Sequence, residues 1–251
     1  MAVLLEGGCR VSTMHEGDPH VSGSLKIWNQ IGKNNGAEAI SLRILEFGPG
    51  TSPRLQNREC DEVLYVLAGE CTVFIDYAAY QVGPQTGIYL RPGETLSVEN
   101  AGPHPVRFVS SQCPEETPRI GLTGPGGPIG PIKNGVSPIV KLSDRRALPT
   151  ADRWYRVLVD DEIGSEQVTQ FVGSIPPGRA PDHFHEYEEV LFILRGEGRM
   201  WAGETNTPIA PGSCIYLPKR QLHCVENTGE GELRLLGVFY PAGSPAVRYG
   251  A

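Results

Sequence analysis

Two histidines separated by one residue, with a glutamate four residues further on, precede a strongly apolar run in PDHFHEYEEVLFILRG (residues 181–196). Alternate side chains of a β-strand lie on one face, so a strand here directs His183 and His185 to the same side and Phe184 to the other. Glu189 follows after a turn, at the head of the apolar run. Imidazoles and a carboxylate brought together in this way can bind a metal ion.

A third histidine, His223, lies in YLPKRQLHCVEN (residues 216–227). Three imidazoles and one carboxylate on neighbouring strands would hold one divalent transition metal and leave positions open for a substrate. The donor set suits Fe2+, Mn2+, Zn2+, Ni2+, Co2+ or Cu2+; Fe2+ is the preferred expectation, although the ligand types alone do not choose among them. The alternative is that the neighbouring histidines form an exposed or hydrogen-bonded pair without a metal, which is the commoner reading of an isolated His-x-His.

The elements that must position these side chains are predicted to be short β-strands. The chain has 251 residues, among them 31 glycines and 22 prolines, and 39% of its residues are hydrophobic. Turn signals recur roughly every eight to twelve residues between strand-like runs. No long helical periodicity is present. These features favour an all-β fold built from small antiparallel barrels or sandwiches.

The chain also contains an internal repeat. ECDEVLYVLAGE (residues 59–70) aligns with EYEEVLFILRGE (residues 186–197), and IYL and VEN recur at the same separation of 127 residues without a gap. One register held over so many positions indicates a duplicated domain. We predict an N-terminal barrel at residues 1–110 and a C-terminal barrel at residues 150–251. A Pro/Gly-rich linker that contains GPGGPIGP joins them at residues 111–149.

The second copy resembles the cupin superfamily. GRAPDHFHEYEEVLFILRG fits the first cupin motif, with its His-x-His, Glu and Gly, and PKRQLHCVEN fits the second, with its Pro, His and Asn. Arg220 stands where the family prefers glycine. Together with the repeat, this resemblance identifies a bicupin and implies two jelly-roll antiparallel β-barrels. It also implies four metal ligands in the C-terminal barrel: His183, His185, Glu189 and His223.

The first copy lacks this donor set. In the same register Glu189 corresponds to Glu62 and His223 to Leu96, and no histidine lies in the stretch that corresponds to the His-x-His pair. We therefore expect the N-terminal barrel to have lost its metal site and to be structural, and to shape the entrance of the other barrel. In one reading, Arg58 pairs with Glu62 where the metal would lie. In the other, Arg58 points to solvent.

Side chains near the ligands in sequence are candidates for catalysis and substrate binding: Glu186, Tyr187 and Arg199 are the three catalytic candidates, and Glu188 is a further acid–base group. Glu186, Tyr187 and Glu188 lie between the histidine pair and the apolar strand. The alternative for the two glutamates is that they are solvated or hydrogen-bonded near the turn. Arg199 lies on the next strand, where it could bind a carboxylate in a bidentate manner; the alternative is a surface arginine on the barrel exterior. Cys224 should face away from the metal.

The predicted function is that of a metal-dependent enzyme acting on a small oxygenated organic substrate. A dioxygenase-type oxidoreductase is favoured because few acid–base groups stand near the predicted ligands. The first alternative is a redox-neutral isomerase, decarboxylase or hydrolase in which the metal acts as a Lewis acid. The second alternative is a small-molecule-binding cupin without catalytic activity.

Charge and composition bear on partners and location. The formal net charge is −7 and no basic run is present, which argues against nucleic-acid binding. No apolar stretch approaches the ~18 residues of a membrane span, and MAVLLEGG lacks the features of a secretory signal. We expect a cytoplasmic protein that forms a homodimer, because strand edges must be covered. The six cysteines include no Cys-x-x-Cys pair and are expected to be free and mostly buried.

Overall fold

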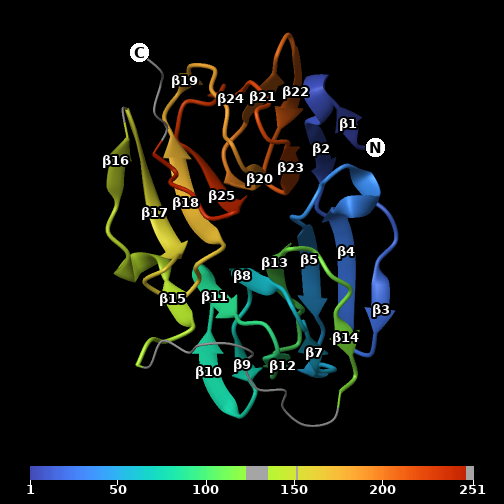
Figure 1. Ribbon diagram of the computed structural model, residues 1–251. Coiled ribbons are helices and arrows are strands. Elements are labelled where there is room, and N and C mark those ends of the chain that lie inside the picture. Colours follow the sequence, from blue (N-terminus) through green and yellow to red (C-terminus); the bar gives the residue numbers. More distant parts are fainter. Residues whose placement is uncertain (123–134, 151, 247–251) are drawn as a thin grey trace.

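The computed structural model describes residues 1–122, 135–150 and 152–246. GPGGPIGP, at residues 124–131 of the predicted linker, lies outside the described residues. The rest is almost entirely β-structure arranged as two barrels, which confirms the predicted all-β fold (Figure 1). Three short 3-10 helices complete the described elements: η1 (Glu6–Gly8), η2 (Lys33–Asn35) and η3 (Leu142–Asp144).

Two antiparallel sheets form the C-terminal barrel. The larger sheet has eight strands, in the order β1 (Val3–Leu4), β2 (Arg10–Thr13), β23 (Ser213–Leu217), β20 (Glu188–Arg195), β25 (Leu233–Tyr240), β18 (Thr169–Ile175), β17 (Arg153–Val159) and β16 (Leu148–Thr150). The smaller sheet has four strands, in the order β19 (Gly178–Arg179), β24 (His223–Asn227), β21 (Gly198–Ala202) and β22 (Thr205–Ile209).

The N-terminal barrel repeats this construction. Its larger sheet has the order β15 (Ile139–Lys141), β11 (Thr86–Leu90), β8 (Asp61–Ala68), β13 (Val106–Cys113), β5 (Leu42–Phe47), β4 (Leu25–Ile31) and β3 (His20–Ser22). The smaller sheet has the order β10 (Ala78–Val82), β9 (Cys71–Ile75), β12 (Thr95–Asn100), β7 (Leu55–Gln56) and β14 (Arg119–Ile120), and β6 (Gly50–Thr51) also pairs with β12.

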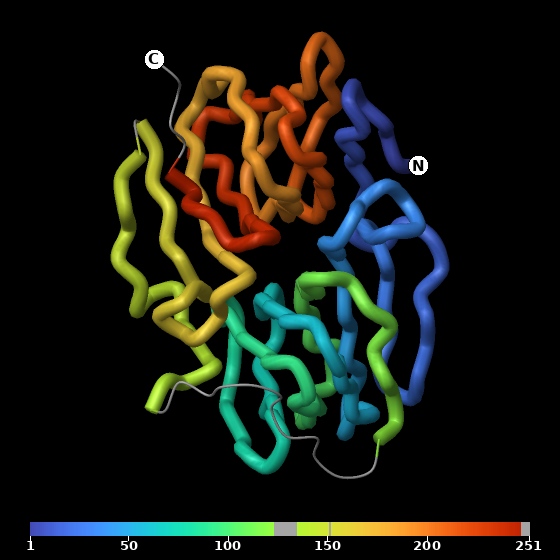
Figure 2. Tube along the Cα trace, in the orientation of Figure 1, coloured from blue at the N-terminus to red at the C-terminus, as the bar shows by residue number. Residues whose placement is uncertain are grey.

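Two segments pair outside the predicted division of the chain: β2 lies in the predicted N-terminal barrel and β15 in the predicted linker. β2 joins the C-terminal barrel, where Val11 pairs with Ile215 of β23. β15 joins the N-terminal barrel, where Ile139 pairs with Ile88 of β11. Figure 2 shows the first of these exchanges, with the blue N-terminal residues beside the orange strands. The predicted division of the chain at residues 110 and 150 stays a prediction. In the structure, strand pairing connects segments that this division separates.

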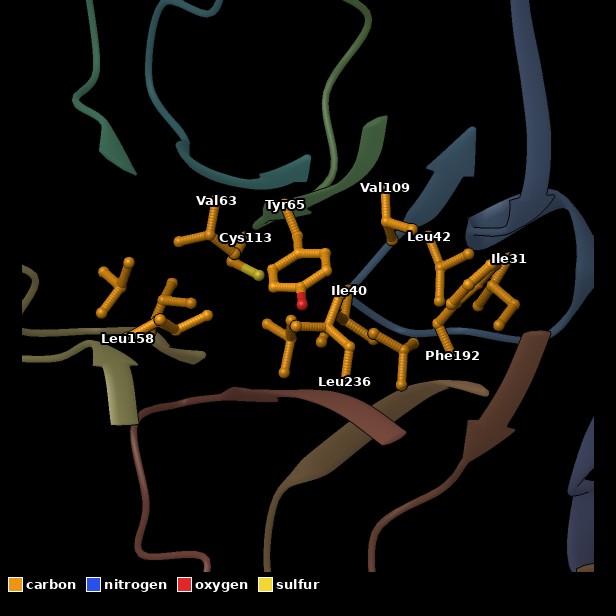
Figure 3. Close-up of a cluster of buried hydrophobic side chains, with 14 of the residues drawn as sticks. Ile31, Ile40, Leu42, Val63, Tyr65, Val109, Cys113, Leu158, Phe192 and Leu236 are labelled. Atoms are coloured by element: carbon orange, nitrogen blue, oxygen red, sulfur yellow. The ribbon is translucent and has the colours of Figure 1, made fainter. Parts of the chain in front are cut away.

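The barrels pack against each other through the outward faces of their larger sheets (Figure 3). Along β8, Val63 and Tyr65 lie in this inter-barrel core, while Leu64 and Val66 lie inside the N-terminal barrel. β20 alternates in the same way between the inter-barrel core and the interior of the C-terminal barrel. Both faces of these strands are buried, which explains why the repeated sequence is an almost continuous apolar run.

The glycine that ends the first motif of each copy lies where the chain passes from the larger sheet to the smaller sheet of its barrel. Gly69 and Gly196 both have a φ of +84°, in the region that glycine adopts without strain. At Gly196 a Cβ would also lie 2.8 Å from the Cα of Leu233, which is too close. Glycine is therefore required between β20 and β21 for two reasons.

Several smaller expectations can be compared with the structure. All six cysteines are free and buried, as predicted. Within the described residues, the structure has no helix with the length and apolar character needed to cross a membrane. The cytoplasmic location and the homodimer stay predictions.

Candidate metal centre

Three histidines and one glutamate meet inside the C-terminal barrel. One ring nitrogen from each of His183, His185 and His223 lies within 4.8 Å of the others. Glu189 Oε2 is 3.5 Å from His185 Nε2 and 3.8 Å from His223 Nε2. Ligands bound to one ion at about 2.0–2.2 Å lie roughly 3–4 Å apart, so these side chains are close to the spacing that a single ion requires.

Backbone contacts fix the segments that carry the histidines. His183 and His223 exchange two backbone hydrogen bonds, of 3.0 and 2.9 Å, which place the two rings side by side, with centroids 4.4 Å apart and planes at 56°. The N–H of Arg220 donates to the carbonyl of His185 at 2.7 Å. Arg220 has a φ of +63°, which accounts for the family's preference for glycine at this position. Phe184 points outward, as strand parity predicted, and is 54% exposed.

The orientation of two of the rings fits a metal. Nδ1 of His183 faces the carbonyl oxygen of Pro181 at 3.2 Å, and Nδ1 of His223 faces that of Gln221 at 2.7 Å. A carbonyl only accepts, so each Nδ1 carries the hydrogen and each Nε2 keeps its lone pair for a metal ion. This is the arrangement in which backbone carbonyls orient metal-binding histidines.

Burial sets the charge state of the site. It lowers the pKa of His223 to about 3 and that of His185 to about 4, with a further contribution from the neighbouring imidazoles. The histidines are therefore neutral at pH 7, which is the form that binds metals. Burial raises the pKa of Glu189 to about 8. A cation among the four side chains would act in the opposite direction and favour the carboxylate of Glu189.

The four side chains line a cavity of about 80 Å³. Its wall is largely apolar, formed by residues such as Phe171, Leu191 and Phe239. Arg153, at the start of β17, also lines it, with a side chain only 13% exposed. Its charge adds to burial in lowering the pKa of His183. Further lining residues are Thr150, Trp154, Tyr155, Gly173, Ser174, Ile175, Ala180, Val225, Leu235 and Pro245.

Glu186 and Arg199, two of the three catalytic candidates, lie away from this cavity. Glu186 is exposed and pairs with Arg220 at 2.7 Å. Arg199 alternates with the buried residues of β21, so its side chain is on the outer face, where Nε donates to Asn206 at 2.7 Å. Arg199 is therefore a surface arginine on the barrel exterior, which was the alternative to a role in binding a carboxylate.

Tyr187, the third candidate, packs against the proposed ligand His185. Its ring stacks on that of His185, with centroids 4.8 Å apart and planes at 10°. Its hydroxyl donates to the carbonyl of Ser244 at 3.1 Å, and its ring also packs against Phe239. The stacked ring restricts the rotation of the His185 imidazole, so the position of Tyr187 fits a supporting role.

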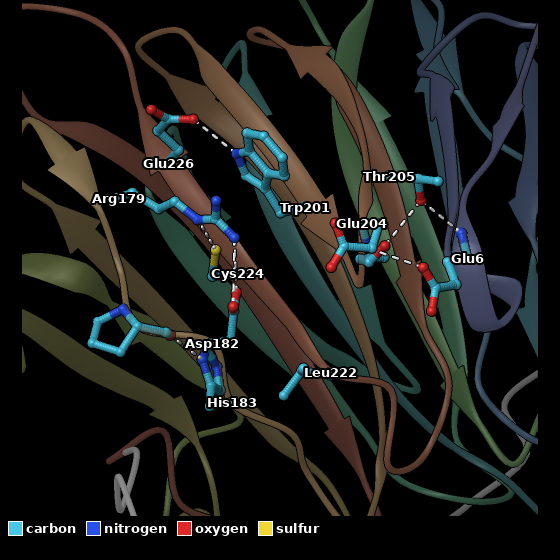
Figure 4. A network of polar contacts seen from close by, with 12 residues as sticks. Glu6, Arg179, Asp182, His183, Trp201, Glu204, Thr205, Leu222, Cys224 and Glu226 are labelled. Atoms are coloured by element: carbon cyan, nitrogen blue, oxygen red, sulfur yellow. Dashed lines mark hydrogen bonds and ion pairs between the residues drawn. The ribbon is translucent and has the colours of Figure 1, made fainter.

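A network of polar contacts braces the outer side of the wall that carries His183 (Figure 4). The guanidinium of Arg179 lies 4.1 Å from the ring centroid of Trp201 and donates to Cys224 Sγ at 3.3 Å. It also pairs with Asp182, at 3.2 Å. Cys224 therefore faces away from the metal site, as strand parity predicted, and the network joins β19, β21 and β24 beside two of the histidines.

Sequence analysis did not identify Arg153 as a candidate. The available signal was an arginine near the head of ADRWYRVLVDDE, the strand that opens the second copy. Strand parity alone does not say that this residue reaches the histidines, because β17 is far from the motif in sequence. The pairing of β17 with β18 decides it, since it brings Trp154 opposite Ser174 at the cavity wall.

The N-terminal barrel has a different arrangement around its equivalent glutamate. Glu62 is buried and pairs with Arg43, whose Nη2 is 2.5 Å from Oε1. Asn57 and the hydroxyl of Ser110 also donate to it. The hypothesis that Arg58 pairs with Glu62 is wrong: Arg58 is exposed, and the cation comes from β5 instead.

Comparisons with known proteins bear on the family. A family model described as "Cupin domain" matches residues 171–239, and one described as "AraC-like ligand binding domain" matches residues 62–128. A structure of oxalate decarboxylase from Bacillus subtilis superposes on 92% of this chain and 75% of its own, with a TM-score of 0.72 at 14% identity. Residues 171–239 match the cupin model, and the chain has the two-barrel fold of a bicupin. The superposition spans both barrels, and at this identity it shows the fold alone.

The curated relatives match shorter segments. Auxin-binding protein 1 from Arabidopsis thaliana is 32% identical over 83 residues, which cover 29% of this chain and 42% of the relative. An oxalate-binding protein from Thermotoga maritima is 36% identical over 66 residues, which cover 26% of this chain and 54% of the relative. The bicupin thus spans about half the length of the curated relatives it matches.

Proposed function

We propose that the C-terminal barrel of this bicupin binds one divalent metal ion and decarboxylates a small oxygenated carboxylic acid there. The proposed ligands are His183, His185, Glu189 and His223. When bound, the ion supplies Lewis-acid charge that withdraws electrons from a coordinated acid. The observation that carries the proposal is the small cavity that this donor set lines together with Arg153, whose side chain is 13% exposed.

The charge around the cavity favours an anionic substrate. Glu189 carries one negative charge and a divalent ion two positive charges, so the occupied site has an excess of positive charge; the charge of Arg153 is shared with Asp152, whose Oδ1 lies 2.9 Å from the Arg153 Nε. A small carboxylate compensates that excess in surroundings of low dielectric constant. Arg153 binds and orients the carboxylate, while the apolar wall excludes water from the opposite side.

The lining also bears on the type of reaction. Besides Glu189, the described lining residues include no aspartate, glutamate or lysine that could act as a general base. Isomerisation and hydrolysis ordinarily need such a base. Decarboxylation breaks a C–C bond, releases CO2 and leaves an electron pair on the remaining fragment, which takes up a proton from solvent. This reaction needs no base in the cavity.

The solved structures with the same fold support a decarboxylase over the dioxygenase that sequence analysis favoured. The superposed bicupins are oxalate decarboxylases, and one of them is described by its Mn(II) centres, with a TM-score of 0.75 at 14% identity. Nothing among the comparisons supports the preference for Fe2+. We therefore propose Mn2+ as the first ion and oxalate as the first substrate to test.

The test is turnover of oxalate by the Mn2+-loaded protein. We expect one formate and one CO2 per oxalate, and about 100-fold lower kcat/KM in Arg153→Gln, because a charge-assisted contact to the substrate is lost. Arg199→Gln is the matched control on the barrel exterior and should keep the wild-type rate. Equal loss of activity in the two variants would contradict the role of Arg153.

A second function is reversible binding of a small carboxylate without turnover. The printed names of two relatives, an auxin-binding and an oxalate-binding protein, favour it. Calorimetric titration with oxalate distinguishes the two functions. Binding without formate release would establish the binding function, and neither binding nor turnover of oxalate would exclude oxalate as the ligand.

A further inference from the structure

Glu188 precedes the proposed ligand Glu189 in β20 and points in the opposite direction, into the interface between the barrels. It is completely buried. Its carboxylate accepts the backbone N–H groups of Glu38 and Ala39, at 2.7 and 2.8 Å, and the hydroxyl of Tyr216 at 2.7 Å. Sequence analysis had placed Glu188 among the acid–base candidates or the solvated residues. It is instead a contact point for a loop of the N-terminal barrel.

The same loop also reaches the turn before β24. The side chain of Glu38 accepts from Lys219 Nζ at 2.7 Å. Lys219 precedes Arg220 and Gln221, whose backbone groups hold the carbonyl of His185 and Nδ1 of His223. A loop of one barrel therefore touches β20, which carries Glu189, and the turn that leads to His223.

We infer that the N-terminal barrel positions the metal centre of the C-terminal barrel, and that Glu188 is the positioning residue through which it acts. The inference rests on the proposed function, because it requires that Glu189 binds a metal. Successive residues of a strand move together, so the three hydrogen bonds to Glu188 fix the backbone from which Glu189 extends. A metal site tolerates about 0.5 Å of displacement before affinity falls.

The N-terminal barrel provides a matched comparison. Asp61 lies 127 residues before Glu188, and it accepts the hydroxyl of Tyr89, which lies 127 residues before Tyr216. Asp61 also lies in the inter-barrel interface and is buried. Its neighbour Glu62 binds Arg43 and not a histidine cluster. Substitutions at Asp61 therefore disturb the same interface without touching a segment that carries ligands.

The first experiment compares Glu188→Gln with Asp61→Asn. Both proteins are stripped with chelator, and binding of Mn2+ is followed by the electron paramagnetic resonance signal of the free ion. Glutamine keeps the shape but directs an amide N–H2 at a backbone donor, so we expect about tenfold weaker binding in Glu188→Gln. Asp61→Asn should bind within about twofold of the wild type. Thermal unfolding of both apo variants reports the disturbance of the interface itself.

A milder pair keeps the test decisive if Glu188→Gln fails to fold. Tyr216→Phe and Tyr89→Phe each remove one hydroxyl from a buried carboxylate and keep the ring. We expect weaker Mn2+ binding and a changed visible spectrum of the Co2+-loaded protein in Tyr216→Phe alone. A purely structural role for Glu188 would lower the unfolding temperature in both variants and leave the cobalt spectrum unchanged.

The outcomes separate this inference from the proposed function. Weaker binding in the Glu188 and Tyr216 variants, with unchanged binding in their controls, supports positioning by the N-terminal barrel. Equal affinity in all four variants and the wild type overturns it while leaving the metal site intact. Equal weakening in all four also overturns it, because the effect would then be general. A wild-type protein that binds neither Mn2+ nor Co2+ overturns both proposals.

Discussion

The two barrels give different answers to the same electrostatic problem. Each has a buried glutamate at the start of a central strand, Glu62 in one and Glu189 in the other, and a buried carboxylate needs a positive partner. In the N-terminal barrel the partner is Arg43, held within 2.5 Å. In the C-terminal barrel the carboxylate faces two neutral imidazoles, and a metal ion is the partner that we propose.

Strand register shows which residues replaced the histidines. His183 faces His223 across the strands of the C-terminal barrel, and Leu55 faces Leu96 at the equivalent place in the other. His185 then corresponds to Asn57, two residues after Leu55. The equivalent positions thus carry apolar and amide side chains, and Arg43 supplies the positive charge beside Glu62.

Breaking the Arg43–Glu62 pair should have the largest effect on stability. Arg43→Met leaves a buried carboxylate without a cation, and we expect the free energy of unfolding to fall by about 3–5 kcal/mol. Urea unfolding of the apo protein measures this loss. Arg58→Met, at an exposed position, should stay within about 0.5 kcal/mol of the wild type. If both variants were equally stable, Arg43 would not be the counterpart of the metal.

Removing one imidazole tests the other side of the comparison. His223→Ala should lower the affinity for Mn2+ by about 100-fold or more, and His183→Ala likewise, while the barrel stays folded because its core lies elsewhere. Metal analysis after dialysis gives the content per chain. His104→Ala, in a loop of the N-terminal barrel, is the control. Full metal content in either ligand variant would refute the ligand assignment.

The smallest effect on metal affinity is expected from changes at Tyr187, whose ring stacks on the proposed ligand His185. Tyr187→Phe loses the hydrogen bond to Ser244 but keeps the ring that stacks on His185. Affinity for Mn2+ should change by less than about threefold, whereas Tyr187→Ala, which removes the ring, should weaken binding by about tenfold. Competition with a chromophoric chelator resolves both values. If both variants bound Mn2+ equally weakly, the hydroxyl of Tyr187 and not its ring would support the site.

Local patterns were sufficient for much of the fold and the donor set. The two copies still align without a gap because equivalent strands such as β8 and β20 are buried on both faces and tolerate few substitutions. The parity of His183 and His185 follows from the two-residue period of a strand. The loss of the site in the first copy was visible because no histidine lies in the corresponding window.

Contacts between distant segments could not be predicted in this way. Arg58, four residues before Glu62, was the partner that sequence analysis considered, whereas Arg43 lies 19 residues before Glu62. The pairing of β5 with β13, in which Arg43 lies opposite Ser110, is not a local property of the sequence. The pairing of β2 with the C-terminal barrel and of β15 with the N-terminal barrel could not be predicted, because it leaves no periodic pattern in the sequence. Glu188 looked like a residue of an exposed turn because its partners, the N–H groups of Glu38 and Ala39, lie about 150 positions away.

The sequence by itself determined which chemical groups this protein can bring to a metal, because the types and strand spacing of His183, His185, Glu189 and His223 are local properties. Only the tertiary structure decided what surrounds those groups. It brought Arg153 to the cavity, gave Glu62 a cation from its own chain and placed Glu188 between the barrels. The physical reason is that burial and charge pairing depend on how sheets pack, and packing joins residues that no local pattern connects.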